Sequence, residues 1–354
     1  MTLINDLPDI SGINLQSSKV GTSTSAPTKR EPMSSSHSSM PTSSRLFHRP
    51  IGASPKAIAL PGSSCLIQPQ MPLARLTSYR VGGNAELFAA PHSMEDVYAV
   101  LNWAENHTVP LMTLGAGSNL LISDQGLPGL VIYTRNLRRT TFEPEHGQVV
   151  ASAGDSLARL AWQAAEKGWR GLEWAVGIPG TVGGAVVMNA GAHQACAADI
   201  FVEADGVSDD RKIKVFRPDD LEFKYRTSNL QHSSFLLTQA RFQLKPGFDP
   251  KTVMNDTRIH LKKRHATQPY HLPSCGSVFR NPSSHAAGWL IEQAGLKGYQ
   301  IGGAQVAQRH ANFILNLGDA KASDIFNLIL EVQQQVEEKW SLLLHPEVKL
   351  VGDF

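Results

Sequence analysis

A run of 25 residues without a formal charge, from Trp174 to Ala198, lies in the middle of this 354-residue chain. The run is long enough to cross a bilayer as a helix. However, it contains five glycines and Pro179, which is too many helix breakers for a membrane span. We therefore interpret it as a glycine-rich loop system whose backbone comes close to another group. That group is either a large ligand or neighbouring packed elements of the protein itself.

The formal charge is unevenly divided along the chain. Residues 1–65 hold six Lys and Arg against three Asp and Glu, a local charge of +3, and the other 289 residues hold 27 against 28, a net of −1. Nucleic-acid-binding domains usually carry a basic stripe, so we expect no nucleic-acid partner. The cysteines are few, odd in number and far apart (Cys65, Cys196 and Cys275), which excludes a disulfide scaffold and favours a reducing compartment.

The N-terminal residues 1–65 contain fifteen Ser and seven Pro and show no apolar periodicity. Such a segment buries too little apolar surface to offset its chain entropy, so we expect a disordered tail. A transit peptide is the alternative, because the segment is Ser-rich and mildly basic. Asp6 and Asp9 argue against that alternative and against a secretory signal. We expect a soluble cytoplasmic protein without membrane insertion.

Beyond the tail, helical and strand patterns alternate, which predicts an α+β protein. The first helix is expected to begin with a capping box, Ser93 and Asp96. Expected helices cover 93–106, 156–167, 253–265, 284–294 and 323–340. Expected strands cover 111–114, 120–122, 130–133, 200–207, 213–216, 235–244, 277–280 and 346–351. The expected divisions are a tail 1–65, a domain 66–247 with lobes 66–136 and 137–247, and a C-terminal domain 248–354.

Two glycine-rich stretches are candidates for ligand binding. In Gly115–Leu121 (GAGSNLL), glycines let backbone N–H groups approach an anion, although for this stretch alone a tight turn between strands is the simpler explanation. The stretch is not a Rossmann fingerprint, because Leu120 stands where the third glycine belongs. The second stretch, Gly177–Ala192, is denser in glycine, with a ligand or a buried linker as its alternative explanations.

Two further segments carry polar residues of interest. Ser277 follows a glycine, but Phe279 replaces the second glycine of a nucleophile elbow, so Ser277 is a proton donor, a hydrogen-bond partner or an ordinary turn serine. Glu347 and Lys349 share one face of an expected strand, for which the solvated face of an edge strand is the simplest explanation. No zinc-type spacing of His or Cys occurs, so we expect no metal.

Taken together in their order, these segments are far more specific than each alone. The segments are YRVGGNA (79–85), GAGSNLL (115–121), GIPGTVGGAVVMNAGA (177–192), YRTS (225–228), CGSVFRNP (275–282), AGWLIEQAGLKGYQIGGAQV (287–306), HANFILN (310–316) and PEV (346–348). From about Met71 onward the chain resembles the UDP-N-acetylenolpyruvoylglucosamine reductases, flavoenzymes of peptidoglycan precursor synthesis. It resembles their shorter form, because only 51 positions separate Arg226 from Ser277.

The resemblance implies a two-lobed FAD-binding domain of the vanillyl-alcohol-oxidase (PCMH) type and a C-terminal α+β domain that binds a sugar nucleotide. It also implies the roles of individual residues. The implied FAD contacts are Gly115, Ala116, Gly117, Ser118, Asn119, Leu120, Ile178, Pro179, Gly180, Gly183, Gly184, Asn189, Gly191, Ala192 and Arg264. The implied substrate contacts are Tyr225, Asn281 and Lys297. Lys349 and His310 replace an arginine and a glutamine of the longer form, which leaves their roles open.

The implied activity is NADPH-dependent reduction of the enolpyruvyl group of the sugar nucleotide by a monomer. In it, Ser277 protonates the substrate, while Arg226 and Glu347 stabilise the intermediate. One alternative is another flavin oxidase or dehydrogenase of the same fold that acts on a sugar or alcohol. Such enzymes often carry a covalent flavin, for which His193 is the candidate attachment residue. A second alternative is a catalytically silent nucleotide-binding module.

Overall fold

The computed structural model describes residues 56–354, so most of the expected tail lies outside the described residues. Within the part that is described, Ile58–Ala59 form a strand, and Leu60 and Cys65 are buried. The expected boundary at residue 66 is therefore wrong. A short apolar stretch between prolines pairs with the first sheet, which the Ser/Pro composition of the segment did not indicate.

The first sheet has five strands and mixed direction. Its order is β1-β2-β3-β6-β4, where β2 pairs antiparallel with β3 and both β3 and β4 run parallel to β6. The strands are β1 (Ile58–Ala59), β2 (Leu66–Pro72), β3 (Asn84–Ala89), β4 (Leu111–Leu114) and β6 (Leu127–Tyr133). Helix α1 (Met94–His107) packs its buried face, including Val97, Val100 and Leu101, into the same core as β4 and β6.

The second sheet is entirely antiparallel, with the order β12-β11-β13-β8-β7. Its strands are β7 (Thr140–Glu143), β8 (Gln148–Ser152), β11 (Phe201–Val207), β12 (Ile213–Phe216) and β13 (Leu236–Gln243). Helices α2 (Leu157–Glu166), α3 (Val182–Val187) and α4 (Pro218–Leu221) and the hairpin β9 (Gly191–Ala192) and β10 (Ala195–Cys196) accompany this sheet. The uncharged run of the sequence thus contains a short helix, α3, where only loop was expected.

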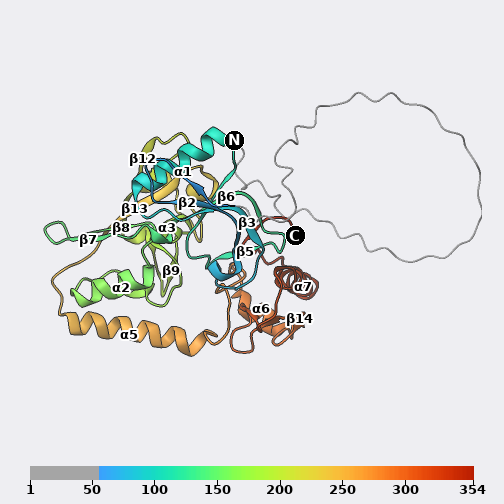
Figure 1. The fold of residues 1–354 in the computed structure, drawn as a ribbon. Helices are drawn as coiled ribbons and strands as arrows, with labels where there is room; N and C mark the ends of the chain where they lie inside the picture. Colours follow the sequence, from blue (N-terminus) through green and yellow to red (C-terminus); the bar gives the residue numbers. More distant parts are fainter. Residues whose placement is uncertain (1–55) are drawn as a thin grey trace, which may run out of the picture. The chain divides into compact units, whose positions relative to one another are not determined.

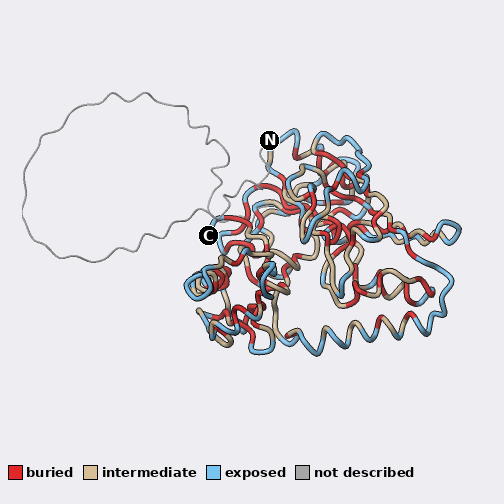
Figure 2. The backbone as a smooth tube through the Cα atoms, turned by 180° about the vertical axis from the view of Figure 1, so that it is seen from behind, coloured by how far each residue is buried: buried red, intermediate tan, exposed pale blue. Residues whose placement is uncertain are grey.

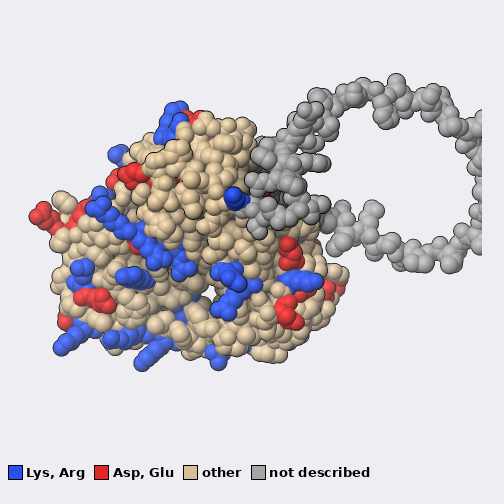
Figure 3. Space-filling view, viewed as in Figure 1, with Lys and Arg blue, Asp and Glu red and all other residues tan. Residues whose placement is uncertain are grey.

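Helix α5 (Pro250–Thr267) runs alongside α2 and leads from the second sheet to the last part of the chain (Figure 1). Only Val253 and Thr257 of this helix are buried, so most of its surface is exposed (Figure 2). Lys and Arg side chains gather along this edge of the molecule, whereas elsewhere on the same face both charge signs are interspersed (Figure 3). Among residues 56–354, no helix has the length and apolar character needed to cross a membrane.

The last hundred residues form a small three-stranded sheet with two helices. The strands are β14 (Gln300–Ile301), β15 (Ala304–Val306) and β16 (Ile314–Asn316), and the helices are α6 (Ala287–Gln293) and α7 (Ala322–Trp340). Short 3-10 helices cover Ala74–Leu76, Thr134–Asn136, Glu173–Ala175, Ala197–Asp199 and Asn229–His232.

The C-terminal strand connects this last part to the first lobe. Strand β17 (Lys349–Val351) pairs in parallel with β5 (Leu120–Ile122), which follows directly after the first glycine-rich turn. Tyr79, Val81 and Leu121 of the first lobe belong to the same buried cluster as the side chains of α6 and α7. Burial of each such side chain contributes about 1.5–3 kcal/mol, so this shared core holds the C-terminal part firmly against the first glycine-rich turn.

Candidate active site

Two charged side chains that are 121 positions apart in sequence form an ion pair. Nε of Arg226 donates to Oε1 of Glu347 over 2.8 Å, and the terminal NH2 group of Arg226 donates to the carbonyl of Gly191 over 2.8 Å. The side chains are only 23% and 14% exposed, respectively. Arg226 has a φ of +57°, a left-handed conformation that few non-glycine residues adopt and that often occurs at functional sites.

The surroundings of Glu347 shift the pKa of its carboxyl upward. Burial raises the pKa of the Glu347 carboxyl above its ordinary value, although the positive charges of Arg226 and Arg280 oppose this rise. Burial also lowers the pKa of Lys349, and the charge of Arg280 lowers it further. A carboxyl with a raised pKa keeps its proton to higher pH than a free glutamate, and in the protonated form it can donate a hydrogen bond to an anionic group beside it.

The segment that follows Ser277 contacts the main chain of Glu347 and its neighbour Pro346. The carbonyl of Val278, the next residue, accepts the N–H of Glu347 over 2.7 Å, and Phe279 pairs with Pro346 as an isolated bridge. The regular strand expected over 277–280 is therefore wrong. The interpretation of Glu347 as part of a solvated face is also wrong, because its side chain is only 14% exposed and pairs with Arg226.

The two glycine-rich stretches meet. A Cβ on Gly115 would lie 2.8 Å from Oγ1 of Thr181, and a Cβ on Gly180 would lie 3.3 Å from Oγ of Ser118. Among the described residues, no main-chain carbonyl accepts the N–H groups of the turn 116–119. Backbone donors left free in a glycine-rich turn are suited to anionic oxygens such as those of a diphosphate. The chemistry of these donors therefore fits FAD, for which the uncharged second stretch supplies an apolar wall.

The remaining residues expected at FAD fall into two groups. Ile178, Pro179, Gly184, Ala192 and Arg264 are partly or fully exposed, and Arg264 lies against Gly177 and binds Tyr270 and Gln268. In contrast, Gly183 and Asn189 make contacts within the protein itself. A Cβ on Gly183 would lie 2.9 Å from Cβ of Ala153, so packing explains this glycine. The buried Asn189 amide bonds Lys224 and Ala198.

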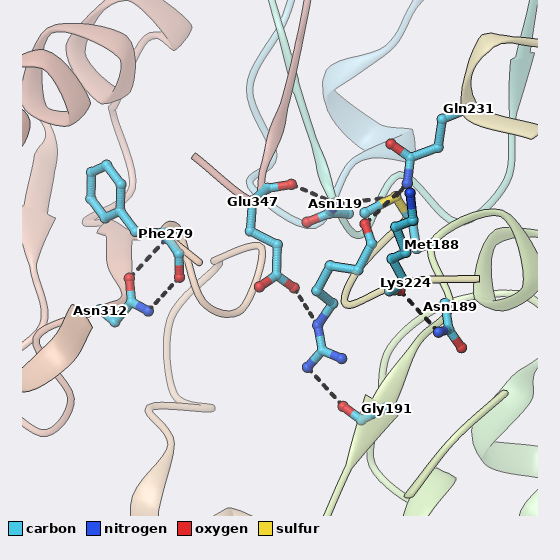
Figure 4. A network of polar contacts seen from close by, with 10 residues as sticks. Asn119, Met188, Asn189, Gly191, Lys224, Gln231, Phe279, Asn312 and Glu347 are labelled. Carbon is cyan, nitrogen blue, oxygen red and sulfur yellow. Dashed lines mark hydrogen bonds and ion pairs between the residues drawn. The ribbon is translucent and has the colours of Figure 1, made fainter. Parts of the chain in front are cut away.

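Asn119 joins the first glycine-rich turn to the ion pair. Its Nδ2 donates to the main-chain carbonyl of Glu347 over 3.0 Å, and its own carbonyl accepts the N–H of Lys349 over 3.0 Å. The same Nδ2 lies 3.8 Å from the sulfur of Met188, at the end of α3 (Figure 4). One residue of the turn thus contacts both the C-terminal segment and the second glycine-rich stretch.

The three residues expected at the substrate lie on different elements. The ring of Tyr225 is 52% exposed and lies below the guanidinium of Arg226, 5.0 Å from its central carbon. Oδ1 of Asn281 accepts the N–H of Ala287 over 3.0 Å, which leaves its NH2 group available. Lys297 pairs with Glu292 over 2.7 Å.

His310 also has a defined place in the same part of the chain. Its Nδ1 accepts the N–H of Asn312 over 3.3 Å, and burial lowers the pKa of the His310 imidazole. The neutral ring packs close to Gly288, where a Cβ would lie 3.2 Å from it.

Sequence reasoning missed several residues that build this site. Asn312 is buried and bonds both main-chain groups of Phe279, at 2.9 and 2.8 Å, which fixes the segment carrying Ser277 (Figure 4). The side chain of Gln231 donates to the main-chain carbonyl of Arg226 and lies against the sulfur of Met188. Asn312 lies in the motif HANFILN and Met188 in the motif GIPGTVGGAVVMNAGA, so a sequence signal existed for both segments. Nothing in the local pattern around Gln231 distinguishes it from a surface residue.

Comparisons with known proteins agree with this architecture. Residues 85–216 match the family profile of an FAD binding domain, and residues 268–351 match that of the UDP-N-acetylenolpyruvoylglucosamine reductase C-terminal domain. The chain is 59% identical over 299 residues to the UDP-N-acetylenolpyruvoylglucosamine reductase of a Nostoc species, covering 84% of this chain and 90% of the relative. It is 54% identical over 308 residues to that of a Synechocystis species, covering 86% and 97%.

Among solved structures, the enzyme of the same name (MurB) from Thermus caldophilus superimposes with a TM-score of 0.69 and 32% identity. The match covers 81% of this chain and 99% of that one. The fold is therefore α+β, an FAD-binding domain of the PCMH type followed by the reductase C-terminal domain, and the protein is an FAD-dependent oxidoreductase of peptidoglycan synthesis. These matches support the reductase rather than the silent nucleotide-binding module. The chain belongs to the UDP-N-acetylenolpyruvoylglucosamine reductase family.

Proposed function

We propose that this protein reduces the enolpyruvyl group of UDP-N-acetylenolpyruvoylglucosamine to give UDP-N-acetylmuramate, with NADPH as the electron donor. The observation that carries the proposal is the partly buried Arg226–Glu347 pair, which lies where the first glycine-rich turn meets the C-terminal strand. FAD, when bound, supplies the two-electron redox chemistry between NADPH and the substrate alkene. The turn 115–120, the stretch 178–192 and Arg264 would hold it.

Arg226 binds and orients the substrate carboxylate. Its planar guanidinium already uses Nε for Glu347 and one NH2 for Gly191, so the remaining donors face the site in a fixed direction. As the alkene is reduced, negative charge spreads onto this carboxylate, and a fixed cation stabilises the charge without reorganisation. Lysine would supply the charge but not the planar geometry.

Glu347 and Ser277 act as hydrogen-bond donor and proton donor, respectively. Burial holds Glu347 toward its protonated form, in which it donates a hydrogen bond to the growing charge. Ser277 gives its hydroxyl proton to the alkene carbon next to the carboxylate, and the resulting alkoxide is reprotonated from solvent. A serine hydroxyl is a weak acid and acts here only because an enolate is strongly basic.

The C-terminal residues 248–354 are proposed to bind the sugar nucleotide, through Tyr225 from the neighbouring lobe together with Asn281 and Lys297. The side chains of Tyr225 and Asn281 are exposed, as contact with a ligand requires. We also propose that the protein acts as a cytoplasmic monomer. The three free cysteines suit a reducing compartment.

The direct experiment is an absorbance spectrum of the purified protein followed by NADPH titration with and without the enolpyruvyl sugar nucleotide. We expect a flavin spectrum that NADPH bleaches, and continuous NADPH oxidation only when the sugar nucleotide is present. Oxygen-dependent turnover without the sugar nucleotide, with yellow colour that stays with acid-precipitated protein, would instead support a covalent-flavin oxidase attached through His193.

A further inference from the structure

Gln231 lies on the 3-10 helix Asn229–His232, five residues after Arg226, and its side chain turns back toward the loop that carries Arg226. Its Nε2 donates to the main-chain carbonyl of Arg226 over 3.0 Å and to that of Val187 over 3.3 Å. The side chain therefore ties the Arg226 loop to the end of α3.

The sulfur of Met188 receives two amide donors. Nε2 of Gln231 lies 3.4 Å from this sulfur, and Nδ2 of Asn119 lies 3.8 Å from it on the other side. Asn119 in turn donates to the carbonyl of Glu347 (Figure 4). A thioether is a weak acceptor, so these contacts contribute little energy. The Met188 sulfur mainly provides one atom against which both amide groups pack.

Together with the ion pair, these contacts form a closed chain of five residues: Arg226, Glu347, Asn119, Met188 and Gln231. The side chains of Arg226 and Glu347 meet at 2.8 Å, and their main-chain carbonyls are held by Gln231 and Asn119, which meet at Met188. Arg226 has a left-handed backbone, with φ of +57°, which costs free energy unless the surroundings enforce it. The side chain of Gln231 helps to enforce this conformation, because it donates to the Arg226 carbonyl.

We propose that Gln231 is a positioning residue for the substrate-reducing step, because its carboxamide fixes the main chain from which Arg226 reaches Glu347. The inference rests on the proposed function of Arg226 and extends it to a residue outside the FAD and substrate contacts. Gln231 acts through Arg226, so its loss affects the step in which the substrate carboxylate gains charge. Reduction of the flavin by NADPH does not use that interaction.

The test replaces Gln231 by Met, which has similar volume but no donor, and follows the two half-reactions by stopped-flow absorbance. We expect flavin reduction by NADPH to stay within about twofold of wild type. Oxidation of the pre-reduced enzyme by the enolpyruvyl sugar nucleotide should fall by about 10- to 100-fold, as is typical when a reacting group is displaced slightly. Equal slowing of both half-reactions, or no change in either, would overturn the proposal.

Three companion variants make the result interpretable. Gln334→Met is the matched control, because Gln334 is exposed on α7 and bonds only Glu338 among the described residues; both half-reactions should match wild type. Met188→Leu keeps the packing and removes the sulfur, and it should slow substrate reduction severalfold even if Gln231→Met does not fold.

Arg226→Lys tests the underlying function: if it leaves substrate reduction unchanged, the proposed function fails. If it slows that step while Gln231→Met does not, only the inference fails.

Discussion

At the scale of the residue, the account depends on Glu347 being partly buried next to a cation. Burial raises the pKa of its carboxyl and Arg226 opposes the rise, so the protonated form persists to higher pH than in a free glutamate. The substrate step needs this protonated form, so its rate should decrease as the pH rises through the raised pKa. This direction is opposite to that of a general base.

The variant Glu347→Gln removes that titration. We expect the rate of substrate reduction to lose its decrease on the alkaline side and to become flat in that range. At neutral pH the rate should fall by less than about 10²-fold, because the amide retains a donor. The measurement is the pH dependence of substrate reduction in single turnover. An alkaline decrease that remains in the variant would assign the titration to another group.

The cysteines differ in their access to solvent. Burial raises the pKa of the Cys275 thiol to about 12, while Cys196 is half-buried and has a pKa raised less far by burial and the charge of Asp199. Thiolates, rather than thiols, react with alkylating agents. We therefore expect iodoacetamide to modify Cys196 in the native protein and to leave Cys275 intact, as measured by mass spectrometry of the peptides. Comparable labelling of both residues would contradict this placement of Cys275.

At the scale of the element, the sequence predicted helices best where local signals are strong. Helix α1 begins after Ser93, whose side chain accepts the N–H of Asp96, as expected. The capping box is only half formed, because the Asp96 carboxylate accepts from His92 and Ser63 instead. Residue 63 comes from the Ser/Pro-rich segment, and only the folded chain brings it to this helix.

The strands of the site were harder to predict, because their pairing is long-range. The alternation in Pro346–Val351 indicated a strand, but its partner β5 lies more than 220 residues earlier, and no local pattern reports that pairing. The segment 277–280 is held by the side chain of Asn312 and by a single bridge to Pro346. The direction of the Glu347 side chain, toward Arg226, therefore could not be predicted from the local sequence.

Helix α7 is capped by a residue from the first lobe. The Asp124 carboxylate accepts the N–H groups of Ala322 and Ser323, at 2.8 and 2.9 Å. Burial raises the pKa of this carboxyl, but the hydrogen bonds from Ser323 and Ala322 together outweigh burial and lower the pKa below its ordinary value. Asp124→Ala should reduce the free energy of unfolding by about 1 kcal/mol at neutral pH.

The pH dependence of this loss has a definite sign. A carboxyl whose pKa is lowered on folding contributes stability above its unfolded pKa, and this contribution is lost as the pH falls through the folded value. The difference between wild type and Asp124→Ala, measured by urea unfolding, should therefore shrink below about pH 4. A difference that stays constant down to pH 2 would show that the carboxylate charge does not contribute.

At the scale of the whole molecule, the site is assembled from parts that are far apart in sequence. In the proposed site, the second lobe supplies Arg226 and the C-terminal part supplies Ser277 and Glu347. The turn of the first lobe contacts Glu347 through Asn119. The family resemblance correctly indicated the fold and the cofactor, and composition alone could not have done so. The network of Gln231, Met188 and Asn312 that holds these parts together was visible only once the chain was folded.

The measurement that tests the account most directly is the rate at which the pre-reduced Ser277→Ala enzyme is oxidised by the enolpyruvyl sugar nucleotide, followed by stopped-flow absorbance. Ser283→Ala, an exposed serine six residues away, is the control. The account predicts that Ser277→Ala slows this step by at least about 10²-fold while NADPH reduces the flavin at the wild-type rate, and that the control changes neither. Equal slowing of both half-reactions in Ser277→Ala, or wild-type rates in both, would contradict it.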